Sequence, residues 1–265
     1  MIYNSLSIAG TDPTGGAGIH ADLKVFSSLG NYGAAVITAL VAQNTCAVQS
    51  IHNLPGEIVA SQLESVLTDV RIDSVKIGML SNATNISIVA AELEKYSLSF
   101  TVLDTVMLAK SGVPLLDADA IDSLIRILLP KVSLITPNLP EAAVLLNCNI
   151  ARNEQEMVSQ GRKLLSFGCP AVLIKGGHLD NKESPDWLIT HSGEWRYSLP
   201  KVRTQNTHGT GCTLSAALAA KRPYFDNWQD TIIAAKNYVQ NTLKHANRLN
   251  VGEGIGPVHH FYTWW

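Results

Sequence analysis

Charge is sparse in this sequence, and no stretch of the chain concentrates it. Charged residues make up 16% of the 265 residues, against roughly 25% in an average protein, and the formal net charge is −2. Lysine and arginine are scattered, which gives no electrostatic case for nucleic-acid binding. So low a charge content also favours a partner subunit that covers part of the surface.

Long apolar runs and paired cysteines are missing as well. No apolar stretch reaches the roughly eighteen residues that a membrane helix needs, and the N-terminus lacks the basic start of a signal peptide. The four cysteines, Cys46, Cys148, Cys169 and Cys212, have neither metal-type nor disulfide-type spacing. We therefore expect a soluble cytoplasmic protein with reduced thiols.

Short apolar segments alternate with amphipathic ones through most of the chain. This order predicts an α/β fold, a three-layer α/β/α sandwich with a mostly parallel sheet between helices. After residue 175 the pattern changes to a hairpin over 186–199, which can form an antiparallel edge. Without a linker or repeat, we expect one domain over residues 1–265. The predicted strands are 6–9, 34–41, 75–79, 101–106, 133–136 and 171–175, and the predicted helices are 20–29, 57–69, 84–96, 117–129, 139–145, 154–167, 213–221 and 228–249.

The segment Gly209-Thr210-Gly211-Cys212 stands directly before an apolar helical pattern. The first amides of a helix have no intrahelical partners and the helix dipole favours negative charge, so this segment predicts an anion site. At such a position the thiol pKa of Cys212 is expected to lie below that of a free cysteine. The alternative for Cys212 alone is a small buried thiol beside a helix cap.

A second glycine-rich loop follows the first predicted strand, with four glycines in the nine positions from Gly10 to Gly18. Gly16, Gly18 and Ala21 formally match a dinucleotide-binding motif. However, the loop is too long, and no acidic residue between Asp22 and residue 57 could bind a ribose. No P-loop motif occurs either, so we expect the loop to border a ligand site at the end of a strand.

Polar side chains follow several of the buried strands. Asp104 closes one strand, while Asn138 and Glu141 share one face of a helix start, and together their oxygens suit a hydrated Mg²⁺ bound with phosphate. An N-cap with its capping-box partner is the alternative for Asn138 and Glu141. Lys175 ends another strand, where it suits a phosphate, unless it is a snorkelling lysine at a sheet edge.

Gln43 comes just after the second predicted strand, and its amide can pair with one edge of an aminopyrimidine-like ring. Asn44 beside it is better explained by a capping turn. Met79 taken alone is more typical of a core than of a site. The pair His259-His260 has no third metal ligand at a recognisable spacing, so we expect it to pack within the C-terminal tail.

These segments together resemble the ribokinase-like superfamily and, within it, the hydroxymethylpyrimidine/phosphomethylpyrimidine kinases of bacterial thiamine biosynthesis. The resemblance covers nearly the whole chain. It implies ATP as donor, Mg²⁺, a homodimer and two successive phosphorylations, first of the hydroxymethyl group and then of the monophosphate. The segments that carry it are AGTDPTGGAGIHADLK, ITALVAQNT, KIGML, LDTVMLAKSG, LITPNLPEA, KGGHL, THGTGCTLSAALAA and GIGPVHHF.

The resemblance also implies a role for each site residue. Cys212 takes the position of the superfamily's aspartate base, with Lys175 as the charge partner of the transferring phosphoryl group. The implied substrate pocket is formed by Gln43, Asp22, Gly10, Met79 and Val106. The implied anion hole is formed by Gly209, Thr210 and Gly211. The implied metal-holding residues are Asp104, Asn138 and Glu141.

Three other functions remain open at this point. A pyridoxal or pyridoxine kinase is the close alternative within the superfamily. A Rossmann-type oxidoreductase would use the Gly16, Gly18 and Ala21 motif but lacks the ribose-binding acid. A Cys-His hydrolase would pair Cys212 with His208 across the glycine-rich loop, without an identifiable third group.

Overall fold

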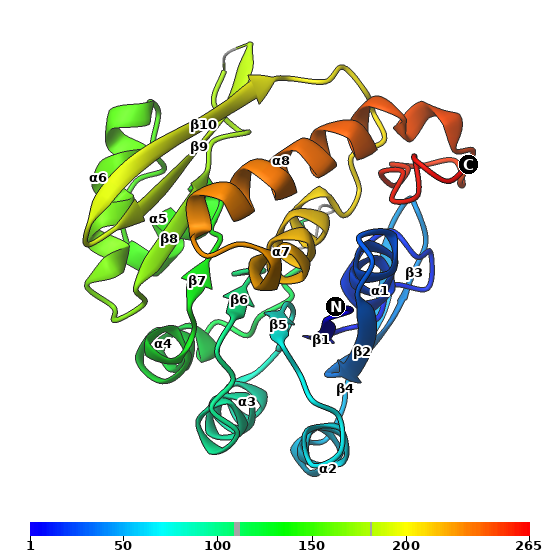
Figure 1. The fold of residues 1–265 in the computed structure, drawn as a ribbon, viewed down its shortest axis with the longest axis vertical. Coiled ribbons are helices and arrows are strands. Elements are labelled where there is room, and N and C mark those ends of the chain that lie inside the picture. Colours follow the sequence, from blue (N-terminus) through cyan, green and yellow to red (C-terminus); the bar gives the residue numbers. More distant parts are fainter. Residues whose placement is uncertain (109–111, 181) are drawn as a thin grey trace.

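The central feature of the computed structural model is an eight-stranded sheet with the order β10-β9-β8-β7-β6-β5-β1-β2 (Figure 1). The structure describes residues 1–108, 112–180 and 182–265. Neighbouring strands from β2 to β8 run parallel, whereas β9 and β10 add an antiparallel hairpin at one edge. The strands are β1 (Asn4–Ala9), β2 (Tyr32–Ile37), β5 (Ser74–Ile77), β6 (Thr101–Leu103), β7 (Leu134–Ile135), β8 (Ala171–Lys175), β9 (Glu183–Thr190) and β10 (Gly193–Pro200).

Helices cover both faces of this sheet (Figure 1). Helices α1, α7 and α8 pack on one face, and α2 to α6 on the other. This confirms the predicted three-layer α/β/α sandwich. The helices are α1 (Gly18–Ser28), α2 (Gly56–Leu67), α3 (Ala83–Lys95), α4 (Ala120–Ser123), α5 (Leu139–Leu146), α6 (Glu154–Leu165), α7 (Thr210–Lys221) and α8 (Trp228–Lys244).

Strand β8 shows why the predicted strands are almost continuously apolar. Val172 and Ile174 pack into the core beneath α5 and α6, while Ala171 and Leu173 face the core beneath α7 and α8. Successive side chains of a strand point to opposite faces, so a strand covered on both sides needs apolar residues at every position. The sheet therefore separates two hydrophobic cores.

The predicted strand 34–41 is wrong as a single element, because the chain bends at Thr38. The backbone N–H of Thr38 still donates to Ala9 in β1, and its hydroxyl donates to the carbonyl of Met79 at 2.6 Å. Beyond this bend, β3 (Ala39–Gln43) leaves the main sheet and pairs antiparallel with β4 (Val48–Asn53), a strand not predicted. Gln43 consequently ends β3 and not the second strand of the main sheet.

Two predicted helices also differ from the structure. The segment 117–129 forms the short helix α4, then a π-helix over Leu124–Leu128 and a 3₁₀ turn over Leu129–Lys131. Pro130 cannot donate to a helical ladder, which accounts for the end of this segment. The predicted helix 228–249 ends at Lys244, and a 3₁₀ turn follows over Ala246–Arg248.

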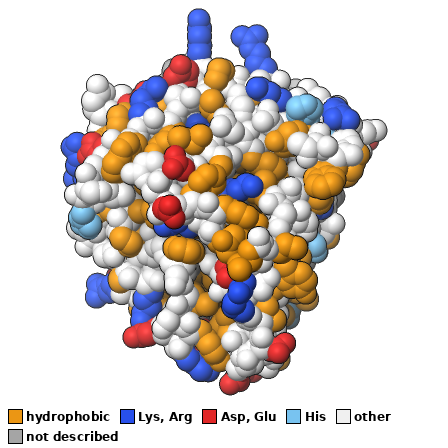
Figure 2. All heavy atoms as spheres, viewed as in Figure 1, with side chains coloured by type: hydrophobic (Ala, Val, Ile, Leu, Met, Phe, Trp, Pro, Cys, Tyr) orange, Lys and Arg blue, Asp and Glu red, His pale blue; other side chains and the backbone are white. Residues whose placement is uncertain are grey.

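Charge is dispersed over the face of the molecule that Figure 2 shows. On the face shown in Figure 2, basic and acidic side chains are interspersed and form no basic patch. Across residues 1–108, 112–180 and 182–265, no helix combines the length and the apolar character that crossing a membrane requires. Residues 109–111, which belong to the segment 103–112 that carries part of the family resemblance, lie outside the described residues.

The C-terminal histidines pack within the structure, as predicted. His260 is 4% exposed, and its Nε2 lies 3.0 Å from the Thr213 hydroxyl of α7. Burial lowers the pKa of His260 from 6.5 to about 3, and the positive charge of Lys24 acts in the same direction. The imidazole is therefore neutral in the folded protein at neutral pH.

This shift predicts an acid sensitivity that depends on His260. Because the unfolded chain binds the proton below pH 6.5 and the folded protein does not, stability falls as the pH drops from 6.5 towards 3. Between pH 7 and pH 5 the loss due to His260 is expected to be about 2 kcal/mol. Chemical denaturation of the wild type and of His260→Gln at both pH values measures it. Equal losses in the two proteins would contradict this account.

Candidate active site

Five of the predicted site residues gather at one edge of the sheet because the strands that carry them are parallel. The carboxyl ends of parallel strands lie at the same edge. Gly10 follows β1, Met79 follows β5, Asp104 follows β6, Asn138 follows β7 and Lys175 ends β8. Residues separated by up to 165 positions thus lie at one edge of the sheet.

An ion pair between Lys175 and Asp104 lies at the centre of this edge. Lys175 Nζ is 3.0 Å from Asp104 Oδ1, and the Asp104 side chain is 3% exposed. The hydroxyl of Ser215, from α7, donates to Asp104 Oδ2 at 3.2 Å. Burial alone would raise the pKa of Asp104, but Lys175 and the more distant Lys76 hold it below its usual value. Asp104 is therefore a charged carboxylate.

Asn138 and Glu141 form the capping box that was the alternative reading of this pair. The Asn138 side chain accepts from the Glu141 N–H at 2.9 Å, and Glu141 Oε2 accepts from the Asn138 N–H at 2.8 Å. The Thr105 hydroxyl donates to the same Oε2 at 3.0 Å. Burial raises the pKa of Glu141, and the neighbouring charge of Asp104 raises it further against the opposing effect of Lys175.

These residues fit a magnesium ion held mainly through water. Among the described residues, no group of three or more His, Cys, Asp or Glu side chains could by itself hold a metal ion. Asp104 and Glu141 nevertheless place two carboxyl groups beside Lys175. Mg²⁺ keeps several waters and commonly binds through one or two carboxylates together with phosphates, so the donor set suits it.

The N-terminus of α7 lies directly against the ion pair. Gly209 is its N-cap and has φ 75°, a left-handed conformation that favours glycine. A Cβ placed on Gly211 in the first turn would lie 3.6 Å from Asp104 Oδ2 and 3.7 Å from Lys175 Nζ. The backbone amides of the first turn and the positive end of the helix dipole thus lie beside the Lys175 ammonium group. Such an arrangement is suited to binding an anion.

The prediction that the Cys212 thiol has a lowered pKa is wrong for this structure. Burial raises the pKa of Cys212 to about 11, and the charges of Asp104 and Asp22 raise it while Lys76 lowers it. The position at a helix start was visible in the sequence, but the burial and the two carboxylates arise from tertiary packing. At neutral pH the group is a thiol.

The residues assigned to the substrate pocket lie in two layers. Met79 is 8% exposed and packs with Val41 of β3. A Cβ on Gly10 would lie 3.1 Å from the Met79 sulfur, so these two residues are neighbours. Val106 is half-buried two residues beyond Asp104, to whose carbonyl it donates its N–H at 2.8 Å. Gln43 is half-buried at the end of β3.

Asp22 lies deeper, in a buried ion pair that the sequence did not reveal. Its Oδ2 accepts from Lys76 Nζ at 2.7 Å and from the Ser7 hydroxyl at 2.6 Å, and both members of the pair are fully buried. Asp22 Oδ1 has no hydrogen-bond partner among the described residues. The one indication of this ion pair in the sequence is that Lys76 is a lysine within an otherwise apolar strand.

His208 does not form the dyad that a Cys-His hydrolase would need. Its Nε2 lies 2.7 Å from Asp12 Oδ2, so the ring engages the first glycine-rich loop. Asp12 is 1% exposed and was not predicted as a site residue. The only indication in the sequence was that Asp12 lies within the glycine-rich loop that we expected to border a ligand site.

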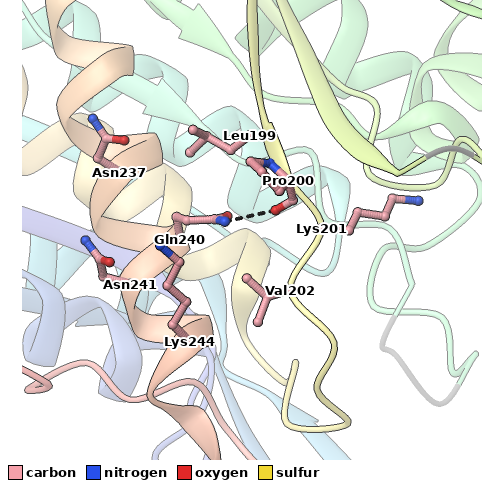
Figure 3. A pocket seen from close by; sticks show the side chains of 8 residues that line it. All are labelled: Leu199, Pro200, Lys201, Val202, Asn237, Gln240, Asn241 and Lys244. Atoms are coloured by element: carbon pink, nitrogen blue, oxygen red, sulfur yellow. Dashed lines mark hydrogen bonds between the residues drawn. The ribbon is translucent and has the colours of Figure 1, made fainter.

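A cavity that no motif predicted lies between the end of β10 and α8 (Figure 3). It has a volume of about 420 Å³, and the Gln240 amide donates across it to the Pro200 carbonyl at 2.9 Å. A second cavity of about 530 Å³ lies further along the same segment, beside Arg203. That segment leads directly to Gly209. The first cavity is lined by Leu199, Pro200, Lys201, Val202, Asn237, Gln240, Asn241 and Lys244.

Comparison with known proteins agrees with this geometry. The family model for phosphomethylpyrimidine kinase matches residues 12–259. The hydroxymethylpyrimidine/phosphomethylpyrimidine kinase of Escherichia coli K12 is 61% identical over 262 residues, which cover 99% of this chain and 98% of the relative. The thiamine biosynthesis bifunctional protein of Geobacter sulfurreducens is 43% identical over 96% of this chain and 51% of its own length.

Among solved structures, the pyridoxal kinase of Staphylococcus aureus in complex with ADP is similar with a TM-score of 0.91. The two proteins are 29% identical, and the match covers 100% of this chain and 95% of the other. This likeness confirms the ribokinase-like fold and argues against the oxidoreductase and the hydrolase. Together with the family match, it establishes that the chain belongs to the phosphomethylpyrimidine kinase family.

Proposed function

We propose that this chain transfers the γ-phosphoryl group of ATP to 4-amino-5-hydroxymethyl-2-methylpyrimidine and then phosphorylates the monophosphate to the diphosphate, within thiamine biosynthesis. The name of the 61% identical relative covers both steps. The observation that carries the proposal is the contact between the first turn of α7, at Gly211, and the Lys175–Asp104 ion pair. This contact forms a phosphate site at the edge where the substrate residues lie.

Phosphoryl transfer depends mainly on positioning and on stabilising charge, because its transition state is loose. In the proposed reaction the amides of Gly209, Thr210 and Gly211 bind the transferring group, and Lys175 balances its charge. The pKa of Lys175 is raised, since Asp104 and Glu141 outweigh the effect of burial, so its ammonium group keeps its charge. When bound near Asp104 and Glu141, Mg²⁺ would neutralise phosphate charge, with Asn138 contributing through water.

Cys212 occupies the position from which a base would act, yet with a pKa of about 11 it is a thiol in the free protein. We assign the base role to its thiolate form, which is a small fraction of Cys212 at neutral pH. The thiolate accepts the proton of the substrate hydroxyl as the phosphorus–oxygen bond forms, and it becomes a thiol. The second step needs hardly any base, because its acceptor is already an ionised phosphate. The two steps therefore depend on Cys212 to different extents.

The cavity beside β10 offers the place for the adenosine part of ATP. Its amides, such as Gln240 and Asn241, can pair with the edge of a base, and Val202 gives an apolar surface. Lys244 supplies positive charge at the cavity, whereas the side chain of Lys201 points away and its ammonium group donates to the Leu179 carbonyl (Figure 3). The segment from Val202 to Gly209 then connects it with the proposed phosphate site. The ADP complex of the structural neighbour supports binding of such a nucleotide.

The substrate pocket is proposed to consist of Gln43, Met79, Val106 and Gly10, with Asp22 beneath them. Pyridoxal kinase is the second candidate because of the S. aureus neighbour, but that protein is 29% identical, against 61% for the pyrimidine kinase relative.

We also propose that residues 1–265 act as one domain, in a cytoplasmic homodimer. The exposed Leu40 on β3, at 47% exposure, supports a covered surface there.

The direct test incubates the purified protein with ATP, Mg²⁺ and the hydroxymethylpyrimidine and follows the mono- and diphosphate. Both products should appear in sequence, and pyridoxal should be a poorer substrate by kcat/KM. Phosphorylation of pyridoxal alone would replace this proposal by the second candidate.

Cys212→Ser should separate the two steps. The variant is expected to lose about a hundredfold in kcat for the first phosphorylation, within the usual range for a proton-transfer group. For the second step the loss should be at least tenfold smaller, because no proton has to leave the acceptor. Single-turnover assays that start from the alcohol and from the monophosphate measure both. An equal loss in both steps would refute the assigned role.

Gly209→Ala should remove the phosphate site. The added Cβ would lie 1.7 Å from the Gly16 carbonyl oxygen at a φ of 75°, so the start of α7 must shift. The expected loss in kcat is about a hundredfold or more, as when one preorganised donor is removed. Gly30→Ala is the matched control, because it has φ 84° with nothing within 4 Å. If both variants keep wild-type kcat, or lose it equally, the helix start is not the phosphate site.

A further inference from the structure

A side-chain hydrogen bond joins the two glycine-rich loops of the site, residues 10–18 and residues 209–211. The ring Nε2 of His208, directly before the second of these loops, lies 2.7 Å from Oδ2 of Asp12 in the first. The Asp12 side chain is 1% exposed and that of His208 is 21% exposed. The bond is therefore largely shielded from water, which strengthens it.

Asp12 is itself fixed within residues 10–18. Its Oδ1 accepts from the Thr14 N–H at 2.9 Å and from the Thr14 hydroxyl at 2.8 Å. Its Oδ2 accepts from the N–H of Ala17 at 2.8 Å and of Gly16 at 3.2 Å. These bonds hold the carboxylate in one place, so a segment that bonds to it is held relative to the whole loop.

The charge of Asp12 determines the direction of its bond with His208. Burial alone would raise the pKa of this carboxyl, but its hydrogen bonds, first among them the one with His208, hold the pKa well below 3.8. The carboxylate is therefore ionised at neutral pH. Because an ionised carboxylate can only accept, the Nε2 of His208 carries the hydrogen and donates it.

The main chain of His208 is held from another direction. Its N–H donates to the Gly256 carbonyl at 3.0 Å, and its carbonyl accepts from the Val258 N–H at 3.4 Å. The residue is thus bonded to the C-terminal segment through its backbone and to Asp12 through its ring. Little freedom remains for Gly209, the next residue and the N-cap of α7.

The main chains of the two loops also lie in direct contact. A Cβ on Gly209 would lie 1.7 Å from the Gly16 carbonyl oxygen, and a Cβ on Gly16 would lie 2.5 Å from His208 Cδ2. No side-chain carbon fits at either point. A displacement of His208 relative to Asp12 must therefore move the start of α7.

The start of α7 is where such a movement matters. Gly211 follows three residues after His208, and its Cβ position lies 3.6 Å from Asp104 Oδ2 and 3.7 Å from Lys175 Nζ. A displacement of about 1 Å can cost a reaction about a hundredfold in rate. The contact that fixes His208 therefore bears on the geometry of the proposed phosphate site.

We propose that Asp12 is a positioning residue for phosphoryl transfer: by accepting the hydrogen bond of His208, it fixes the start of α7 against Lys175 and Asp104. The inference rests on the proposed function, since it takes the start of α7 as the phosphate site. Asp12 touches no reacting atom in this account and acts through His208.

The test compares two amides at position 208. The Nε2 of glutamine is as many bonds from the backbone as the Nε2 of histidine, so His208→Gln can still donate to Asp12, whereas the amide of His208→Asn is one bond too short. The second phosphorylation is measured from the monophosphate, because that step hardly depends on Cys212. His208→Asn should lose about tenfold or more in kcat, with KM for ATP changed by less than about threefold. His208→Gln should keep kcat within about threefold of the wild type.

A double variant tests whether Asp12 acts through His208. In Asp12→Asn an amide group can replace Oδ2, the atom that accepts from His208, so kcat should fall at least as far as in His208→Asn. Adding His208→Asn to Asp12→Asn should lower kcat no further, because residues that act through one contact are not additive. Losses that multiply would overturn the proposed role.

Thr14→Val is the matched control. It also removes one side-chain donor from Asp12, but from within the loop, and it leaves the His208 contact in place. Its kcat should equal that of the wild type, while its melting temperature should fall about as far as that of His208→Asn. An equal loss of kcat in both variants would overturn the proposal. His208→Leu, which has no donor, serves as the second loss variant if His208→Asn does not fold.

A binding measurement separates this inference from the proposed function. With Mg²⁺ present, calorimetry should show the Kd of AMP-PCP about fivefold or more higher in His208→Asn and the Kd of ADP unchanged, because AMP-PCP alone carries a γ-phosphate. If the wild type phosphorylates no pyrimidine, the proposed function fails and this comparison decides on Asp12. If the wild type is active but His208→Asn keeps its kcat, or His208→Gln loses as much, the role of Asp12 is overturned while the function stands. A wild type that binds no AMP-PCP overturns both.

Discussion

The ion pair between Lys175 and Asp104 is the interaction on which the rest of the site depends. It joins the ends of β6 and β8, and Ser215 ties α7 to the same carboxylate. Removing one member of a buried pair leaves the other charge uncompensated and typically costs about 3–5 kcal/mol. Both partners must therefore remain, which places a cation, a carboxylate and a helix start within a few ångströms of each other. The proposed phosphate site therefore lies beside an ion pair that charge balance inside the fold requires.

Much of the fold was predictable because it is encoded locally. Strand β8 was predicted with its observed bounds, Ala171–Lys175, since a strand covered on both faces has an uninterrupted apolar run. The hairpin β9–β10 was equally visible from its alternation and turn. In the site, the strand-end residues Asp104 and Lys175 were predictable because topology alone brings such residues to one edge. Their direct pairing was not, because it depends on the relative placement of β6 and β8.

The errors share a physical cause, which is that they depend on contacts between distant segments. The apolar run 34–41 gives no local sign that Thr38 turns its hydroxyl to Met79 and bends the chain. The thiol of Cys212 has a raised pKa because burial and two carboxylates outweigh its helix position. Nothing in the sequence distinguishes Asp12, whose contact with His208 joins residues that are 196 positions apart.

The separate pairing of β3 with β4 has a consequence for how such kinases diverge. Gln43 belongs to a two-stranded sheet that is separate from the eight-stranded one and is joined to the segment after β1 by the Thr11 N–H, which donates to the Ala39 carbonyl at 2.9 Å. If Gln43 contacts the substrate as proposed, mutations in that small sheet can change which substrates are accepted while the framework that carries Lys175 and α7 stays in place. New substrate preferences can therefore evolve on an unaltered catalytic scaffold, and a structural neighbour that is a pyridoxal kinase shares this scaffold at 29% identity.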